Sequence, residues 1–408
     1  MSKILAIHGG KPVRKRPFPA WPIITDSLIE DISRTTASGA WSIAKGTETS
    51  AFEQIFAKIH GVRYCTACTN GTHSLLIALL ACGIQAGQEV IVPSWTFFST
   101  AQVVVAANCI PVFADIDPET LTLDMKHVAS LINKNTFGII PVHFAGHPAD
   151  MTTLMQLCKI HNLICIEDCA QAHGATYHGK SVGSFGQAGS FSFQMSKNIT
   201  AGEGGALITN DSTVNEQIFS HYNLGRSFSN YVQYIHESIG SNYRMTEFQS
   251  VLLMHAVISL YEYTNRRNEN AYYLDNLLSS IEGITTFKAE DSIRHGRHIY
   301  PFRFLKEHFP NGDKKKFVEA LLAEGIPITV GYIMGVHQQP VFQNLEFGPY
   351  TGYKITNEAL SYADVTLPQT DKAVREVCFL PQNTLLGDHT DMENIAEAIN
   401  KVAIYFRN

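Results

Sequence analysis

The sequence predicts an α/β fold, with a mainly parallel central sheet flanked by helices and a smaller α+β domain at the C-terminus. From about residue 60 to 210, apolar β-rich runs alternate with segments of helical periodicity, which is typical of crossover units in a parallel sheet. A long helical pattern follows Arg244 and leads out of this region. Beyond about residue 280, short strands and helices mix without that alternation.

The strands expected in the central sheet are short apolar runs. In chain order they cover residues 89–94, 110–116, 138–144, 163–168, 189–193 and 205–209. Amphipathic helices are expected between them, for example at 72–83 and 151–162. In an open sheet of this kind, the residues that bind ligands gather at the carboxyl ends of the strands.

The C-terminal part is expected to form a separate domain. The helical pattern at 245–281 leads to it, and its own expected elements are helices at 313–325 and 391–406 and a short strand within 326–334. We place the boundary near 265–285. The chain then divides into a large domain at 1–275, whose first residues (about 30) form an arm, and a small domain at 276–408.

Composition and charge disfavour several classes of protein. The 408 residues are 45% apolar and 17% charged, with a net charge of −6, so nucleic acid is not an expected partner despite the basic run at 11–16. We find no bilayer-spanning apolar run and no signal peptide, and therefore expect a cytoplasmic protein without a membrane partner. No metal site is expected, because the CxxC at 65–68 has no second CxxC and structural zinc needs four converging ligands. "HFAGH" at 143–147 is interpreted as a strand that ends in a loop.

Two charged side chains follow strands of the predicted sheet. Asp168 ends the run 163–168, and a carboxylate at the end of a buried strand is costly unless a cation or hydrogen-bond donor meets it. Lys197 lies just beyond the strand 189–193. A cofactor with a ring nitrogen for Asp168 and an aldehyde for Lys197 satisfies both, and pyridoxal 5'-phosphate (PLP) is such a cofactor. Asp168 would keep the ring nitrogen protonated, while Lys197 would bind the aldehyde and then move the substrate proton.

The phosphate and the ring of this cofactor need partners too. A helix expected to start at Thr72 leaves the backbone N–H groups of Gly71, Thr72 and His73 free to bind an anion. Ser192 offers a hydroxyl in the same region. A flat ring needs a face on which to stack. The segment after the strand 89–94 supplies three aromatic side chains, Trp95, Phe97 and Phe98.

Each of these residues also has an ordinary structural interpretation. Asp168 and Thr72 are typical helix caps, aromatic residues are typical of the core, and a lysine before glycines is typical of a surface loop. No complete phosphate-loop pattern is present and no GxGxxG follows a strand, which disfavours a nucleotide-binding protein. The order of the residues favours the cofactor site, since cradle, aromatic face, acid and lysine each follow a strand of one sheet.

Four segments together carry a resemblance to a known family. They are "NGTHSLLIALL", "IEDCAQAHGA", "SFSFQMSKNITAGEGGALITND" and "GSNYRMTEFQSVLL". The chain resembles the DegT/DnrJ/EryC1/StrS family of sugar aminotransferases, which have the PLP-dependent transferase fold type I. The resemblance extends over nearly the full chain, from "GGKPVR" to "LLGDHTDMENIAEAINKV".

The resemblance implies roles around the cofactor ring. Lys197 corresponds to the lysine that binds PLP covalently, and Asp168 to the partner of the ring nitrogen. Gln171 would lie beside the phenolic oxygen. Phe97 would stack on the ring, with Trp95 beside it.

The resemblance also implies how the phosphate is bound. Thr72, the backbone of His73 and the hydroxyl of Ser192 would contact it. Asn242 matches an asparagine that family members donate across a dimer interface to the phosphate of the neighbouring subunit. The resemblance therefore implies a homodimer whose active sites are shared between subunits.

The expected function is transfer of an amino group from glutamine or glutamate to a ketone of a cyclitol or sugar. One branch of the family replaces the lysine with histidine and dehydrates sugars, so Lys197 favours transamination. "GGKPVR", "WP", "SFSFQ" and "LLG" resemble the branch that acts on keto-cyclitols such as scyllo-inosose and on aminohydroxybenzoate precursors. The alternatives are a nucleotide-linked keto-sugar aminotransferase, a PLP-dependent dehydratase or aromatising lyase, and a PLP-binding regulator without turnover.

Overall fold

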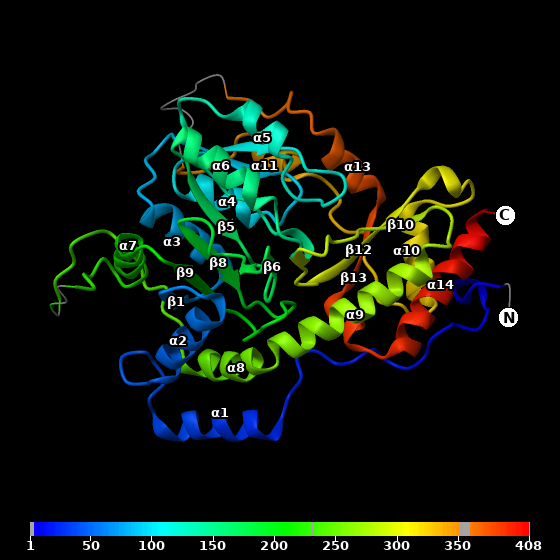
Figure 1. Cartoon of the computed structure of the whole chain (residues 1–408), viewed down its shortest axis with the longest axis horizontal. Helices are drawn as coiled ribbons and strands as arrows, with labels where there is room; N and C mark the ends of the chain where they lie inside the picture. Colours follow the sequence, from blue (N-terminus) through cyan, green and yellow to red (C-terminus); the bar gives the residue numbers. More distant parts are fainter. Residues whose placement is uncertain (1–3, 230–231, 233, 351, 353–359, 408) are drawn as a thin grey trace.

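A computed structural model describes residues 4–229, 232, 234–350, 352 and 360–407. A seven-stranded sheet lies at the centre of the larger part of the molecule (Figure 1), in the order β1-β9-β8-β5-β4-β2-β3. Its strands are β1 (Tyr64–Cys68), β2 (Glu89–Pro93), β3 (Ile110–Ala114), β4 (Thr136–Ile139), β5 (Ile164–Asp168), β8 (Ala188–Ser192) and β9 (Gly205–Thr209). The strands from β3 to β8 pair in parallel, whereas β9 is antiparallel to both of its neighbours. The prediction of a mainly parallel sheet is confirmed.

Six of the seven strands follow the expected runs, and β1 is the exception. Its sequence, "YCTAC", contains the CxxC that we considered as a metal motif. The strand pairs with β9 over its whole length. A strand of five residues shows little hydrophobic periodicity, so the sequence pattern did not predict this strand.

Helices cover both faces of the sheet because its strands alternate apolar side chains between the two faces. Val90 and Val92 belong to one core, with the side chains of α3, α4 and α7. Ile91 lies in another core, with the side chains of α5 and α6. The helices of this part are α1 (Asp26–Ser38), α2 (Glu48–His60), α3 (Gly71–Ala81), α4 (Ser99–Ala106), α5 (Met125–Leu131), α6 (Met151–His161), α7 (Ser212–Tyr222) and α8 (Glu247–Ile258).

A second sheet lies beside α9 and α14 (Figure 1). It is antiparallel, in the order β10-β12-β13. Its strands are β10 (Ile284–Thr286), β12 (Ile299–Phe304) and β13 (Val377–Pro381). The helices of the C-terminal part are α9 (Leu260–Leu278), α10 (Lys314–Ala323), α11 (Pro340–Gln343), α13 (Pro368–Glu376) and α14 (His389–Arg407), of which α11 packs into the core of the central sheet through Phe342. Short elements complete the fold, namely β6 (Thr176–Tyr177), β7 (Lys180–Ser181), β11 (Ile293–Arg294) and the 3₁₀ turns Ala6–His8, Phe144–Gly146, Lys306–His308, Val336–Gln338 and Gln382–Leu386. The division at residue 275 stays a prediction.

Two expectations for the C-terminal part are wrong in detail. The helical pattern 245–281 forms two helices, α8 and α9, which meet at Ser259. The expected strand within 326–334 is reduced to one bridge between Thr329 and Phe379. Pro327 has no N–H to donate and Gly331 has a positive φ of 72°, so regular pairing ends on either side of Thr329.

The N-terminal arm connects the two sheets. Arg14 donates to Asp391 at 2.6 Å, which fixes the arm beside α14. Further along, the indole N–H of Trp21 donates to the carbonyl of Lys197 at 3.0 Å. The arm therefore reaches from the second sheet to the loop that carries the predicted active-site lysine. Among the described residues, no helix is long and apolar enough to cross a membrane.

Candidate active site

A pocket of about 790 Å³ lies at the carboxyl ends of the central strands. Its volume is in the range of small-molecule sites. Eight of the nine predicted site residues line it: Gly71, Thr72, His73, Phe97, Asp168, Gln171, Ser192 and Lys197. Residues of the C-terminal part complete the lining, including His298, Tyr332 and Phe379.

Asp168 and its neighbour Glu167 point to opposite sides of β5, since successive side chains of a strand alternate. Asp168 lines the pocket, whereas Glu167 is fully buried. The Glu167 carboxylate accepts a bond from His143 Nε2 at 3.1 Å. It also accepts bonds from the backbone N–H groups of Gly183, Phe185 and Gly186. Glu167 therefore fixes the turn before β8, and Asp168 is the one of these two carboxylates that lines the pocket.

The same carboxylate belongs to a group of potential metal ligands. Atoms of His143, Glu167 and Cys169 lie within 4.8 Å of one another. Both oxygens of Glu167 already accept hydrogen bonds, and the other nitrogen of His143 accepts the N–H of Ala149 at 3.0 Å. These bonds occupy the lone pairs that a metal would need, so the group is a structural hydrogen-bond network.

The Asp168 carboxylate has two donors within the protein. The hydroxyl of Thr100 donates to Oδ2 at 2.9 Å, and the N–H of Ala170 donates to Oδ1 at 3.1 Å. Burial raises the pKa of Asp168, while these bonds and the charge of Lys197 oppose that rise. The two bonds hold the carboxylate of Asp168 in a fixed position in the pocket lining, where it can pair with a cationic group of a ligand.

Lys197 lies in the loop between β8 and β9, where its side chain enters the same pocket. Burial lowers the pKa of Lys197 to about 8, against the attraction of Asp168. A lysine at this pKa has a substantial neutral fraction near neutral pH, and only the neutral amine is a nucleophile. Its Nζ lies 3.4 Å from Nε2 of His298.

The start of α3 forms an anion cradle, although the details differ from the prediction. Asn70 is the N-cap, and its side chain accepts the N–H of His73 at 2.8 Å. The prediction that this N–H is free is therefore wrong. The N–H groups of Gly71 and Thr72 precede the first intrahelical bond, which Ser74 donates to Asn70, so both are left for an anion.

Gly71 makes this cradle possible. A Cβ at residue 71 would lie 2.5 Å from the Cβ of Ser192, so only glycine allows the helix start to approach the end of β8 so closely. The approach places the hydroxyl of Ser192 beside the two N–H groups. Thr72 contributes its own hydroxyl, which is 2.8 Å from that of Ser99.

Only one of the three predicted aromatic side chains offers an open face. Phe97 is 63% exposed and lines the pocket. Trp95 has no exposed surface and packs edge-on against Tyr332, with ring centroids 5.1 Å apart. Phe98 packs against Phe342 at 5.9 Å. Phe97 is thus available for stacking, whereas Trp95 packs behind Tyr332, which lines the pocket.

The last two predicted residues differ in their surroundings. Gln171 is buried, and its side-chain oxygen accepts the N–H of Ala145 at 2.9 Å. Its side chain also bonds the hydroxyl of Tyr332. Asn242 does not line the pocket and lies on an exposed segment after α7. Its predicted contact with a second subunit stays a prediction.

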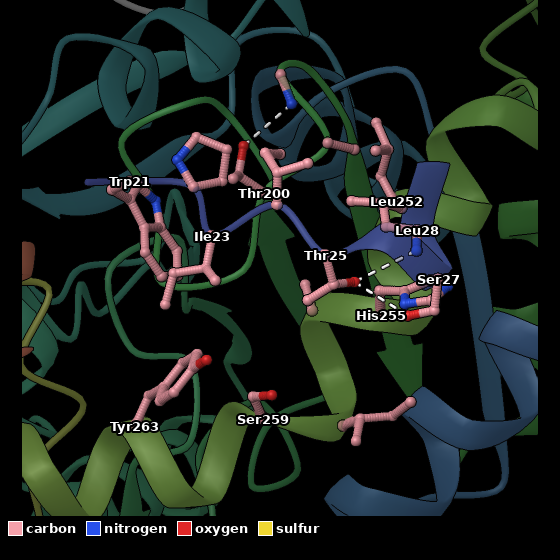
Figure 2. A pocket seen from close by; sticks show the side chains of 16 residues that line it. Trp21, Ile23, Thr25, Ser27, Leu28, Thr200, Leu252, His255, Ser259 and Tyr263 are labelled. Atoms are coloured by element: carbon pink, nitrogen blue, oxygen red, sulfur yellow. Dashed lines mark hydrogen bonds between the residues drawn. The ribbon is translucent and has the colours of Figure 1, made fainter. Parts of the chain in front are cut away.

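A second cavity, of about 340 Å³, lies on the other side of the lysine loop. Figure 2 shows Trp21 and Ile23 of the arm facing Ser259 and Tyr263 across it, with Thr200 of the loop above. Its lining is mostly apolar and includes neither Asp168 nor Lys197. Of these two cavities, only the larger one is therefore lined by Asp168 and Lys197.

Three contacts of the site were missed from the sequence. Asn70 directly precedes the predicted Gly71, and an asparagine before a helix is a typical cap signal that would have identified it. Thr100 lies two residues after Phe98. His298 directly precedes β12, far along the chain from Lys197. No local pattern around His298 indicates this contact.

Comparisons with known proteins agree with the geometry. The model of the DegT/DnrJ/EryC1/StrS aminotransferase family matches residues 22–400. An L-glutamine:2-deoxy-scyllo-inosose aminotransferase from Streptomyces kanamyceticus is 35% identical over 98% of this chain and 97% of its own, and one from Micromonospora echinospora is 32% identical over the same shares. Among solved structures, 3-amino-5-hydroxybenzoic acid synthase has a TM-score of 0.87 at 30% identity, covering 97% of this chain and all of that one. The aminotransferase from Psychrobacter cryohalolentis has the same score and identity and covers 96% of this chain.

Proposed function

The chain belongs to the DegT/DnrJ/EryC1/StrS aminotransferase family, and from this premise we propose that it transfers an amino group from glutamine or glutamate to a ring ketone of a cyclitol. The enzyme is a PLP-dependent aminotransferase with the fold type I of such enzymes. The names of its relatives support glutamine as the donor and a scyllo-inosose as the acceptor. The observation that carries the proposal is the presence of Lys197 and Asp168 in one pocket with an anion cradle.

The residues of the pocket fit PLP. The two N–H groups at the start of α3 and the hydroxyls of Thr72 and Ser192 suit a phosphate. Phe97 provides an open aromatic face, and Asp168 provides an anion for the protonated ring nitrogen. When bound, PLP supplies an electron sink for the carbon that carries the amino group.

The residues of the chain then have distinct tasks. Asp168 is held by Thr100 and Ala170. Its buried carboxylate would keep a proton on the ring nitrogen, because a negative charge in a place with little water strongly favours a positive charge beside it. Lys197 first anchors the cofactor and, once it is free, takes the proton from the substrate Cα. In the return direction Lys197 delivers a proton to the former carbonyl carbon of the acceptor. The donor leaves before the acceptor binds, so ping-pong kinetics are expected.

We further propose a cytoplasmic homodimer. The supporting observation is that Asn242 lies on an exposed segment outside the pocket of its own chain, where it is accessible to a second copy. The homodimer and the exchange of Asn242 are measurable by sedimentation and by mixing Asn242→Ala with Lys197→Ala subunits. Activity recovered in the mixture would support a shared site.

The decisive experiment supplies PLP-loaded enzyme with glutamine and one ketone at a time. The ketones are 2-deoxy-scyllo-inosose, scyllo-inosose and a nucleotide-linked keto sugar, and the products are identified by mass spectrometry. We expect an amine from a free cyclitol ketone. An amine from the nucleotide-linked sugar alone would overturn the cyclitol proposal, and a dehydrated product without any amine would show a lyase.

A matched pair of variants tests the role of Lys197. Lys197→Ala should lower turnover by about 100-fold to 10,000-fold, the usual contribution of a positioned proton-transfer group. Lys159→Ala, at an exposed lysine of α6, should leave it unchanged. Full turnover in Lys197→Ala would exclude the assigned role.

A further inference from the structure

The imidazole of His298 lies against the amine of Lys197. His298 precedes β12 in the second sheet, and its Nε2 is 3.4 Å from Lys197 Nζ. Both side chains line the PLP pocket. Nδ1 of His298 is buried and has no hydrogen-bond partner among the described residues. Among the described residues, the contact with Lys197 is therefore the one hydrogen bond that this ring makes.

The surroundings keep His298 neutral. Burial is the main cause that lowers the pKa of His298 well below its ordinary value, and the charged or titratable groups facing it, Lys197, His173 and Arg267, lower it further. The acid Asp168 acts on Lys197 from the β5 side. A neutral imidazole has one N–H and one lone pair. Toward the ammonium form of Lys197, which can only donate, Nε2 must be the acceptor, so that Nδ1 carries the proton.

The backbone around His298 fixes the ring in this place. The N–H of His298 donates to the carbonyl of Ala145 at 2.9 Å, and the N–H of Gly296 donates to that of Gly146 at 2.8 Å. The side chain of Asn198, the residue after Lys197, donates to the carbonyl of Gly296 at 2.6 Å. The loop that presents the imidazole is thus bonded directly to the loop that presents the amine.

We propose that His298 is the positioning residue for Lys197: its Nε2 accepts a hydrogen bond from the free amine and directs the lone pair of that amine into the pocket. An amine that donates to Nε2 has its lone pair on a side away from the imidazole, where it would be available to an aldehyde or a substrate Cα bound in the same pocket. An amine that is already oriented loses less entropy on reaching the reactive geometry, so it reacts faster. This inference rests on the proposed role of Lys197, but not on the identity of the ketone.

The test measures how fast apoprotein takes up PLP as a function of pH, by stopped-flow absorbance and without any substrate. In the native protein the uptake rate should rise with a midpoint near pH 8, as Lys197 loses its proton. His298→Leu removes the acceptor that stabilises the ammonium. The midpoint should fall by about one pH unit, the size expected for one hydrogen bond to a charged group, and the plateau at high pH should fall about tenfold as orientation is lost.

Two further variants distinguish loss of the contact between His298 and Lys197 from a general disturbance of the fold. His298→Gln keeps a neutral acceptor and should restore the plateau to within about twofold of the native value. His147→Gln removes another buried histidine that does not touch Lys197, and should change neither parameter. If His298→Leu has the native midpoint and plateau, or if His147→Gln changes them equally, the proposal is wrong. Native uptake in Lys197→Ala would instead refute the role of Lys197 itself.

A measurement on the native chain covers the case in which His298→Leu does not fold. Nitrogen NMR of ¹⁵N-histidine apoprotein reports the tautomer of each imidazole. The signal that is lost in His298→Gln should show a neutral ring protonated at Nδ1. A ring protonated at Nε2, or at both nitrogens, would contradict the acceptor role.

Discussion

Substitution of Gly71 by alanine tests the anion cradle most directly. The new Cβ would lie 2.5 Å from the Cβ of Ser192, whereas ordinary contacts begin at 3.4 Å, so the two backbones must separate by about 0.9 Å. Ser192 ends β8, which is bonded on both sides by β5 and β9. The start of α3 is therefore the part that must move.

That displacement is large enough to break hydrogen bonds from the helix to a bound phosphate. A bond of 2.9 Å that lengthens by about 0.9 Å is no longer a hydrogen bond. Losing one bond to a charged group costs about 1.5–3 kcal/mol, which corresponds to a roughly 10-fold to 100-fold weaker affinity for PLP. Overpacking should also lower the unfolding free energy by about 1–3 kcal/mol.

The assay compares two ligands on the apoprotein of Gly71→Ala. PLP affinity should fall, whereas the affinity for pyridoxal, which has no phosphate, should stay close to the native value. Fluorescence titration of each ligand measures both affinities. An equal loss for the two ligands would show that the substitution damages the whole pocket, and unchanged PLP affinity would show that the cradle does not bind the phosphate.

Three further predictions concern the acid, the stacking face and the amine. Thr100→Val removes the donor to Asp168, so the pKa of Asp168 should rise further and the acidic limb of the pH–rate profile should move up by about one pH unit. Phe97→Ala should weaken PLP binding about threefold to tenfold without loss of thermal stability, whereas Phe98→Ala, whose side chain is half-buried, should destabilise the protein by about 1–3 kcal/mol in thermal melts. Acetylation of apoprotein, followed by peptide mass spectrometry, should give a midpoint near pH 8 for Lys197 and near pH 10 for exposed lysines. A midpoint near 10 for Lys197 would show that burial does not suppress its charge.

Residues that carry chemistry at strand ends could be placed from the sequence. Asp168 and Lys197 were predicted to share a site because both follow strands of one sheet, and the structure brings both into one pocket. Periodicity located six of the seven central strands, since strands that are buried on both faces are continuous apolar runs.

Contacts that depend on tertiary packing could not be placed. The pattern at 245–281 remains helical through Ser259, so nothing in the periodicity indicates the junction of α8 and α9. Trp95 and Phe97 are alike as aromatic residues two positions apart, and only tertiary packing, against Phe144, Tyr332 and Phe379, buries the first. His298 reaches Lys197 because the second sheet lies over the pocket, which no local segment encodes.

The amine and the imidazole come from segments beside different sheets. Lys197 belongs to the loop between β8 and β9, both interior strands, and His298 directly precedes β12 of the second sheet. Hydrogen bonds at Ala145, Gly146 and Asn198 nevertheless tie the segment that carries the imidazole to the larger part of the molecule. The spacing of the two nitrogens is thus set by bonds of the neighbouring residues as well as by the two side chains themselves.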